Sequence, residues 1–237
     1  VGRQRLDDVE RISDNGEATE IFLRSSGGKR RTLAADPELM NLVIALEGHP
    51  LSLRLLGSAS QGFGDLVSLR RRWEKEKADL LRDGPDETRL TSTRASLRVS
   101  LASPLLTPAG KRLLSLLAFL PAGMQRDDAD LMLPNAGEDA ASNIVSLRLA
   151  DERVGRLSML APLREAALLE LPAEDADRFR LIEHFLLIAR DGGMAGRTGW
   201  AEVRTRVMRE AGNLDAVCLL AIATKHNADL LDSLRGL

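Results

Sequence analysis

The chain contains 237 residues, with 33 basic and 35 acidic side chains and a formal net charge of −2 at pH 7. Aromatic residues make up only 3% of the sequence and tyrosine is absent, so a hydrophobic core must be built from Leu, Ala, Val and Ile. Such a composition favours packed helices over a β-sandwich, whose strands prefer aromatic and β-branched residues. The balanced charge argues against a nucleic-acid partner, because duplex-binding domains usually carry a basic excess.

Cysteine content and apolar runs bear on the compartment. The single cysteine, Cys218, excludes a disulfide within the chain and is typical of a reducing environment, so we expect a cytoplasmic protein. The sequence has neither a signal-peptide pattern nor an apolar run long enough to span a bilayer, and we expect no membrane partner. Because the chain starts at Val1 instead of a methionine, we expect it to be a fragment of a longer protein.

Residues 1–86 are expected to form a helical bundle, the first of three domains in a mainly α chain. Asp14 is a favourable N-cap for a first helix that ends at a glycine pair, and the basic residues 29–31 are expected in a loop. A second helix, capped by Asp36, carries an apolar stripe at positions i, i+3, i+4 and i+7, made of Leu39, Leu42, Val43 and Leu46.

A buried helix and a charged helix complete this bundle. Residues 51–59 are apolar on most sides, which indicates a buried helix that begins directly after Pro50. From Asp65 onward we expect an amphipathic helix whose charged face is solvated and laced with weak ion pairs. The turn-forming residues 83–86 end that helix, and we place the first domain boundary there. The apolar stripe of the charged helix consists of Leu66, Leu69, Trp73 and Leu80.

Residues 87–172 have a different pattern, which we interpret as a winged-helix domain. Apolar Leu147 and Leu149, and then Leu157 and Met159, alternate with polar residues, which predicts a short β-hairpin, the only one in the chain. Several helices followed by one hairpin are the outline of a winged helix. The helices are expected at 92–101, 112–120, 127–133, 138–148 and 162–171.

Residues 173–237 are expected to be helical again, as the start of a TPR-like superhelix. A first helix has Phe179, Ile182, Phe185 and Ala189 on one stripe. A pair of helices follows at 200–207 and 214–221, with Gly212 and Asn213 as the tight turn between them. Two antiparallel helices of this kind resemble one unit of a helical repeat.

The sequence contains no motif for catalysis or metal binding. It has no GxxxxGK[ST] loop, no GxGxxG segment after a strand and no paired cysteines. His49, His184 and His226 are far apart, so we expect neither catalytic residues nor a metal site. We expect His184 at a helix surface or boundary and Cys218 in the core.

Two segments are candidates for a binding role. At Gly48, His49 and Pro50 a glycine ends one helix and a proline begins the next, which is either a plain corner or a flat apolar face for a purine. Residues 156–165 pass from the hairpin into a helix, where Met159 is either core filler or part of a functional segment. The residues alone leave both alternatives open.

At these two places the sequence resembles the STAND ATPases, including the NB-ARC group. Residues 48–51 are similar to the Gly-x-Pro-Leu segment of that family, and residues 159–165 occupy the place of its Met-His-Asp-like segment. Residues 73–120 and 200–223 resemble the passage into the family's winged helix and the start of its superhelical repeats. The resemblance covers nearly the whole chain in the right order.

The resemblance implies a regulatory fragment of a nucleotide-dependent signalling switch. In this family a P-loop domain holds ADP or ATP with Mg²⁺, and the helical and winged-helix domains close over it and relay its state to partner domains. The implied nucleotide-contacting residues are Gly48, His49, Pro50, Met159 and Arg164, with Pro50 at the adenine. The implied partners are the missing P-loop domain and other protein domains or subunits.

The sequence also departs from the family's pattern. Leu160 and Ala161 stand where the family often has a phosphate-contacting His and an Asp, and a leucine can neither donate a hydrogen bond nor carry charge. Arg164 is the candidate substitute, and pairing with a carboxylate is its alternative role. Because these residues contain no P-loop, we expect this chain to have no cofactor, no hydrolysis and at best very weak ADP binding.

Two other functions are compatible with the sequence. A helical protein-interaction scaffold would need no nucleotide. A winged-helix DNA-binding regulator would need a basic recognition helix, but the candidate at 138–148 begins with Glu138 and Asp139.

Overall fold

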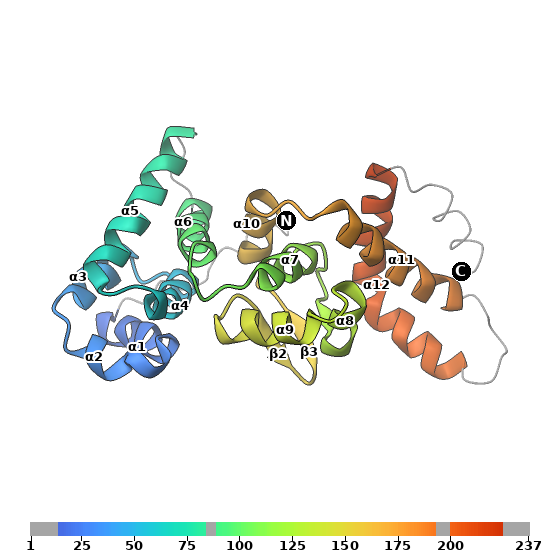
Figure 1. Cartoon of the computed structure of the whole chain (residues 1–237), viewed down its shortest axis with the longest axis horizontal. Helices are drawn as coiled ribbons and strands as arrows, with labels where there is room; N and C mark the ends of the chain where they lie inside the picture. Colours follow the sequence, from blue (N-terminus) through green and yellow to red (C-terminus); the bar gives the residue numbers. More distant parts are fainter. Residues whose placement is uncertain (1–13, 84–88, 193–199, 225–237) are drawn as a thin grey trace, which may run out of the picture. The chain divides into compact units, whose positions relative to one another are not determined.

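The computed structural model describes residues 14–83, 89–192 and 200–224, which are mainly α-helical with one small antiparallel sheet (Figure 1). The chain divides into two compact units, residues 1–106 and 107–237, and each is described here by itself.

The first unit is entirely helical in its described part. Its α-helices pack as pairs, with α1 against α4 and α3, and α6 against α4 and α5. The elements are α1 (Asn15–Ser25), η1 (Gly27–Lys29), α2 (Arg30–Ala34), α3 (Glu38–Ala45), α4 (Pro50–Ala59), η2 (Ser60–Gly62), α5 (Leu66–Asp83) and α6 (Arg89–Leu101).

The predicted start of α1 is confirmed, because the carboxylate of Asp14 accepts the N–H of Gly16 at 2.8 Å. The loop predicted at 29–31 is wrong. Lys29 closes a 3-10 turn, and its Nζ donates to the carbonyl oxygen of Phe63 at 2.6 Å, while Arg30 begins α2 and pairs with Glu20 at 2.6 Å. These tertiary contacts hold a basic segment in helical conformation that its local sequence does not predict.

The core of the first unit confirms the predicted apolar stripes of α3 and α5. All eight stripe residues are buried and are joined by aliphatic side chains of the neighbouring helices. The core consists of Ala18, Phe22, Leu23, Leu33, Leu39, Leu42, Val43, Leu46, Leu53, Leu56, Ala59, Leu66, Leu69, Trp73, Leu80, Ala95 and Val99. As expected, α4 is buried on most sides.

Helices α1 and α4 approach each other closely at Gly57. A Cβ atom at this position would lie 2.4 Å from the carbonyl oxygen of Phe22 and 2.9 Å from the Cβ of Ser25. Only glycine fits such a contact without moving backbone. The aliphatic and small residues that dominate the sequence therefore allow the helices of this unit to pack closely.

Helix α6 belongs to the first unit. The indole Nε1 of Trp73 on α5 donates to Oγ of Ser96 on α6 at 3.1 Å, and Ala95 and Val99 of α6 lie in the core. The turn residues predict a first boundary near residue 86, whereas the compact units divide after Leu106. The turn expected at 83–86 lies for the most part outside the described residues.

The second unit combines helices with the sheet. Its elements in chain order are α7 (Pro108–Leu117), β1 (Met124–Gln125), η3 (Arg126–Asp128), α8 (Ala129–Met132), α9 (Gly137–Ser146), β2 (Asp151–Arg153), β3 (Arg156–Ser158), α10 (Ala161–Glu170), α11 (Asp175–Gly192) and α12 (Trp200–Ala223). Thr107 caps α7 through its hydroxyl, which accepts the N–H of Gly110 at 3.0 Å.

A hairpin is present as predicted, formed by β2 and β3, but its first strand begins after Leu147 and Leu149 instead of containing them. The hairpin also pairs with β1, a strand that was not predicted from the sequence. The strand order is β1-β3-β2, all antiparallel, with Met124 opposite Leu157 and Glu152 opposite Leu157 on the other side. The hairpin turns at Val154 and Gly155, whose φ angles are 49° and 69°. Two consecutive positive φ angles define a type I′ turn.

The C-terminal helices α11 and α12 pack against each other along much of their length. Phe185, Ile182 and Ala189 of α11 are buried as expected, but Phe179 is 39% exposed and does not belong to the buried stripe. The turn predicted at Gly212 and Asn213 is wrong, because α12 continues through both residues.

Candidate functional site

The corner between α3 and α4 is built by two residues with left-handed backbone. Glu47 and Gly48 have φ angles of 52° and 66°, and the N–H of His49 donates to the carbonyl oxygen of Leu46 at 3.0 Å. Glycine adopts this conformation without a steric penalty, whereas Glu47 adopts it at some cost. The corner therefore ends α3 sharply and places Pro50 at the first position of α4.

His49 and Pro50 have defined structural roles at this corner. The Nδ1 atom of His49 accepts the N–H of Ser52 at 3.3 Å, so His49 is the N-cap of α4. Pro50 has no N–H to leave unsatisfied at the first helical turn. Gly48 is buried, and both His49 and Pro50 are half-buried.

The second candidate segment runs from β3 into α10. Met159 is buried and Leu160, the residue before α10, is 44% exposed. Arg164 on α10 is half-buried, and its Nη1 lies 3.5 Å from the carbonyl oxygen of Pro121. The contact described for Arg164 is thus with main chain, not with the carboxylate considered from the sequence.

The five candidate residues fall into two groups. Gly48, His49 and Pro50 lie together in the first unit, and Met159 and Arg164 lie together at the β3–α10 passage of the second unit. The residues of each group are close together in the sequence. The structure therefore shows the burial and hydrogen bonds of each group by itself.

A buried polar network joins α12 to the sheet, and we call it the clasp. It consists of Arg156, Glu210 and Asn213, whose side chains are 18%, 5% and 0% exposed. Two guanidinium nitrogens of Arg156 donate to the two carboxylate oxygens of Glu210, both at 2.7 Å. Asn213 Nδ2 also donates to Glu210, at 2.6 Å.

The clasp also holds the turn between α7 and β1. Arg156 donates to the carbonyl oxygens of Ala122 (2.6 Å) and Gly123 (3.0 Å). Asn213 accepts the N–H of Ala122 at 2.9 Å and donates to Gly123 at 2.7 Å. Every polar group of this buried set has a partner, which is the condition under which buried polar residues stabilise a fold.

The clasp was not predicted from the sequence, because Gly212 and Asn213 are typical of a turn between two helices. Glu210 and Asn213 lie at i and i+3, so a continuous helix places both on one face. The i, i+3 spacing of Glu210 and Asn213 indicates a shared helix face, but the poor helix propensity of Gly212 and Asn213 favours a turn. The partner, Arg156, is 54 residues away from Glu210 in the sequence and could not be assigned.

A second network joins α7 to α11. Asp177 is fully buried and accepts two hydrogen bonds from Arg112, at 2.7 and 2.6 Å, and one from Arg180 at 2.7 Å. Burial by itself would raise the pKa of Asp177, but the hydrogen bonds and positive charges of Arg112 and Arg180 outweigh it and lower that pKa. The carboxylate is therefore held ionised in the interior.

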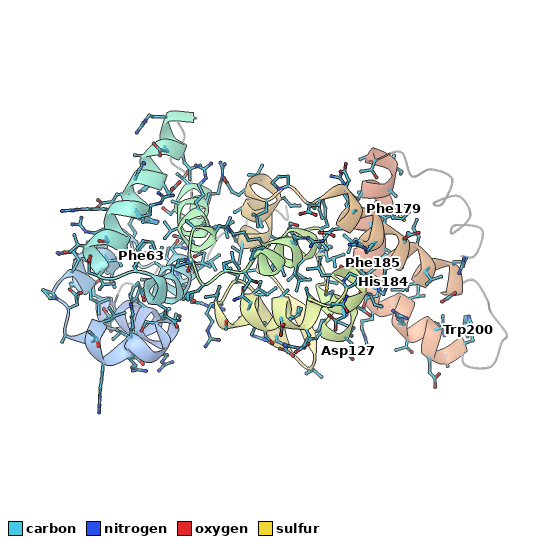
Figure 2. All side chains as sticks on the ribbon, viewed as in Figure 1. Phe63, Asp127, Phe179, His184, Phe185 and Trp200 are labelled. Carbon is cyan, nitrogen blue, oxygen red and sulfur yellow. The ribbon has the colours of Figure 1, made fainter. Side chains whose placement is uncertain are left out.

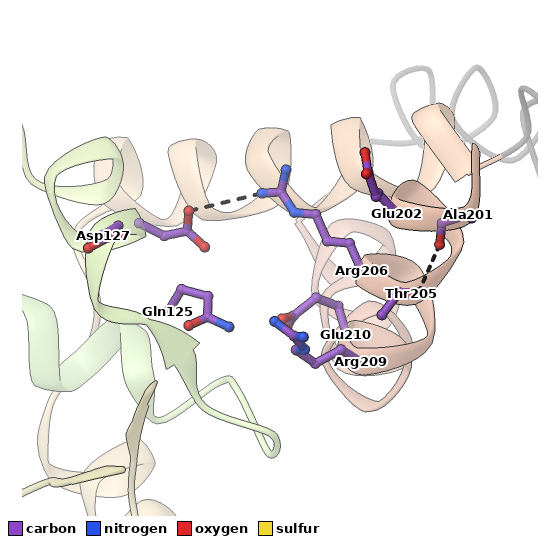
Figure 3. Close-up of a pocket in the computed structure, with 9 residues that line it drawn as sticks. Gln125, Asp127, Ala201, Glu202, Thr205, Arg206, Arg209 and Glu210 are labelled. Atoms are coloured by element: carbon purple, nitrogen blue, oxygen red, sulfur yellow. Dashed lines mark hydrogen bonds and ion pairs between the residues drawn. The ribbon is translucent and has the colours of Figure 1, made fainter. Parts of the chain in front are cut away.

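An open cavity of about 700 Å³ lies beside the clasp, between the β1–η3 segment and the N-terminal half of α12 (Figure 3). Asp128 on one wall lies 4.0 Å from Arg206 on the other and 3.4 Å from Nε2 of His184. The lining is of mixed charge, with Gln125, Asp127, Asp128, Ala201, Glu202, Thr205, Arg206, Arg209 and Glu210. Four of these side chains are acidic and two are basic, so the cavity presents both signs of charge and does not select one class of ligand.

His184 and Cys218 occupy the places expected from the sequence only in part. The side chain of His184, in the middle of α11, is 11% exposed and meets the ring of Phe185 edge-on, which places it at the boundary between core and surface (Figure 2). Cys218 is half-buried, not fully in the core, and burial together with Asp215 raises the pKa of its thiol. His226 lies outside the described residues.

Helix α9 has no basic side chain and opens with Glu138 and Asp139. Glu138 pairs with Arg126 at 2.5 Å, and Arg126 also contacts Glu152 of β2. Arg126 is therefore committed to carboxylates, and α9 offers negative charge where a recognition helix needs positive charge.

Within residues 14–83, 89–192 and 200–224, no group of three or more His, Cys, Asp or Glu residues is arranged to hold a metal ion. No helix in that described part is both long and apolar enough to cross a membrane. Comparison with protein-family models, with curated proteins and with solved structures found no match for this chain.

Proposed function

We propose that this chain is a regulatory fragment of a STAND/NB-ARC-like signalling switch. In this proposal a P-loop domain outside these 237 residues binds ADP or ATP with Mg²⁺. The residues of this chain then close over the nucleotide and relay its state to partner domains. The chain itself contributes contacts and movement, and the hydrolytic groups belong to the P-loop domain.

The observation that carries the proposal is the order of elements α7–β1–α8–α9–β2–β3–α10. A helix, a short strand, two helices and a hairpin on a three-stranded antiparallel sheet are the elements of a winged-helix domain. Met159 follows β3 directly. That is the place where the resemblance puts the segment that reports on the phosphates.

The geometry of the α3–α4 corner supports the proposal. Pro50 is held at the start of α4 by the left-handed residues before it and by the His49 cap, so its ring has a fixed orientation. The ring of this half-buried proline is a suitable surface for an adenine base, because both are flat and largely apolar. Gly48 adds no side chain that would stand in the way.

The alternatives are a helical interaction scaffold and a DNA-binding regulator. The scaffold requires no nucleotide and assigns Pro50 a purely local role. The DNA-binding alternative is disfavoured by the acidic α9 and by the pairing of Arg126 with Glu138. Both alternatives predict that replacing Pro50 leaves nucleotide binding unaffected.

The proposal is tested on the full-length gene product that contains this chain. We expect it to purify with bound ADP, quantified after denaturation by chromatography. We expect Pro50→Ala to speed the release of a fluorescent ADP analogue severalfold, because the apolar contact to the base is lost. The 237-residue chain alone should show no saturable ADP binding at micromolar concentrations, since it has no phosphate-binding loop.

Pro108→Ala is the matched control, because Pro108 occupies the same first-turn position in α7. It should leave ADP release unchanged. A full-length protein that neither retains nor binds ADP would contradict the proposal. Retention of ADP with identical release rates for Pro50→Ala and the parent would assign the corner to a local role and favour the scaffold.

A further inference from the structure

Helix α12 runs without interruption through a pair of residues that disfavour a helix interior. Gly212 and Asn213 lie 12 and 13 positions after its first residue, Trp200, and well before its last, Ala223. Glycine has the poorest helix propensity after proline, and asparagine competes for backbone hydrogen bonds. The local sequence therefore favours two shorter helices over one long helix.

The clasp supplies what the local sequence lacks. Asn213 is fully buried, and its side chain bonds the N–H of Ala122, the carbonyl oxygen of Gly123 and the carboxylate of Glu210. These partners are satisfied only while α12 is continuous, because residues 210 and 213 share a face only in a helix. Tertiary contacts thus hold the weak point of α12 in helical conformation.

Gly212 has no packing role in the continuous helix. The residue is exposed, and an added Cβ would find a single atom within reach, the Cγ of Pro121 at 4.0 Å. By contrast, a Cβ at Gly57 or Gly123 would collide with backbone. The structure would accept alanine at position 212, so packing in the continuous helix does not require a glycine there.

We propose that α12 is a two-state helix whose continuity depends on the clasp. With the clasp closed, α12 is a single helix anchored to β3 and to the α7–β1 turn. With the clasp open, α12 breaks at Gly212 and Asn213 into the two shorter helices that the sequence pattern predicts. The inference stands on these contacts and goes beyond the proposed nucleotide switch, on which it does not depend.

Arg156 is the group through which the clasp is opened. It lies on β3, three residues before Met159, and it connects the sheet with both the α7–β1 turn and α12. A displacement of β3 by the length of one hydrogen bond would break its contacts with Glu210. Glu210 would then be a buried carboxylate without its cation, a costly state that separation of α12 relieves.

The test measures the continuity of α12 in the 237-residue chain. Spin labels at Glu202 and Leu219, both exposed, lie about 26 Å apart along a continuous helix, which rises about 1.5 Å per residue. Cys218 is replaced by alanine to avoid a third label. Arg156→Met opens the clasp without changing the sequence of α12, and pulsed electron resonance then gives the distance distribution.

We expect one distance in the parent, a second and shorter distance in Arg156→Met, and a severalfold decrease of that second population when Gly212→Ala is added. Glu210→Gln, which keeps the side-chain shape and weakens the pairing, should give a smaller second population. Hydrogen exchange of α7 should stay at the parental rate, which separates a break in α12 from loss of the unit's fold. A single unchanged distance in both clasp variants, or a second population that Gly212→Ala does not decrease, would overturn the inference.

Discussion

Single glycine positions determine how closely the helices of the first unit approach one another. Gly57 allows the backbone of α4 to lie against the carbonyl oxygen of Phe22 on α1. Gly28, in the same unit, has no heavy atom within 4 Å of the place where a Cβ would be. The two positions therefore differ in packing although both are glycines, and a matched pair of substitutions can measure the difference.

Gly57→Ala should destabilise the chain by about 3 kcal/mol or more, because the added methyl group would force α1 and α4 apart in a close-packed interior. Gly28→Ala should change stability by less than about 1 kcal/mol. Urea denaturation followed by circular dichroism measures both. Equal effects of the two substitutions would show that the close approach of α1 and α4 does not limit stability.

The turn of the hairpin places a β-branched residue in an unfavourable conformation. Val154 has a φ angle of 49° and is fully exposed, so it gains nothing from packing. Asparagine tolerates this conformation far better, and Asn-Gly is the preferred pair for a type I′ turn.

Val154→Asn should therefore raise the free energy of unfolding of the second unit by about 1 kcal/mol, by relief of strain at this φ angle. Val154→Thr is the control, because it is polar but keeps the branched Cβ, and it should have little effect. Thermal unfolding of the three proteins distinguishes the cases. A gain for threonine equal to that for asparagine would assign the effect to polarity instead of backbone strain.

At the scale of elements, two buried networks attach the C-terminal helices to the rest of the second unit. The clasp anchors α12, and Asp177 with Arg112 and Arg180 anchors α11. Removing one member of such a network leaves a buried charge unpaired, which costs more than the pair contributed. Asp177 is also the group whose titration makes this attachment depend on pH.

Asp177→Asn should destabilise the second unit by about 3 kcal/mol at pH 7, because Arg112 and Arg180 lose their ionised partner. The pKa of Asp177 is lower in the folded chain than in the unfolded chain. Its stabilising contribution is therefore fully present above the unfolded pKa, near 3.9, and is lost as pH falls through the folded value.

The measurement is a series of urea denaturation curves for the parent and Asp177→Asn between pH 7 and pH 3. We expect the difference between them to be constant down to about pH 5 and to shrink below about pH 4. A difference that stays constant to pH 3 would mean that Asp177 does not titrate in this range in either state.

Elements whose stability is local could be predicted from the sequence, and elements that depend on distant partners could not. The stripe of α3 and the existence of the β2–β3 hairpin, though not the position of its first strand, were predicted from periodicity and turn residues alone. The continuity of α12 depends on Ala122 and Gly123, about ninety residues away. Strand β1 has only two residues and exists because β3 pairs with it. Periodicity cannot detect a strand of that length.

In the candidate site too, the local features could be predicted from the sequence and the hydrogen-bond partners could not. The corner at Gly48 and Pro50 follows from a glycine and a proline at fixed positions, and the structure has it. The role of His49 as N-cap was not predicted, because histidine is uncommon there. The contacts that the resemblance implies between His49 and a nucleotide stay a prediction, as do those of Met159 and Arg164.

At the scale of the whole molecule, the chain is made of two compact units with separate cores. The first unit includes α6, whose Ala95 and Val99 complete its core and whose Ser96 accepts the hydrogen bond of Trp73. A boundary near residue 86 would leave Trp73 without this partner and would expose apolar surface. The position of the boundary can be tested by truncation.

Residues 1–106 produced alone should unfold cooperatively in urea, whereas residues 1–86 should not, because the core of the shorter fragment lacks α6. Residues 107–237 should also fold alone, so the far-ultraviolet spectra of the two halves should add up to that of the whole chain. Cooperative unfolding of 1–86 with the same midpoint as 1–106 would place the boundary where the sequence pattern did.

Gly123 has a consequence for genetics. Its φ angle is 72°, a Cβ there would lie 2.0 Å from the carbonyl oxygen of Leu157, and its own carbonyl oxygen accepts bonds from Arg156 and Asn213. A single residue, Gly123, is therefore required for the α7–β1 turn, for the close approach to β3 and for the attachment of α12. A screen for conditional alleles that spare the first unit should find its hits concentrated at this codon, and suppressors of such alleles should arise on α12.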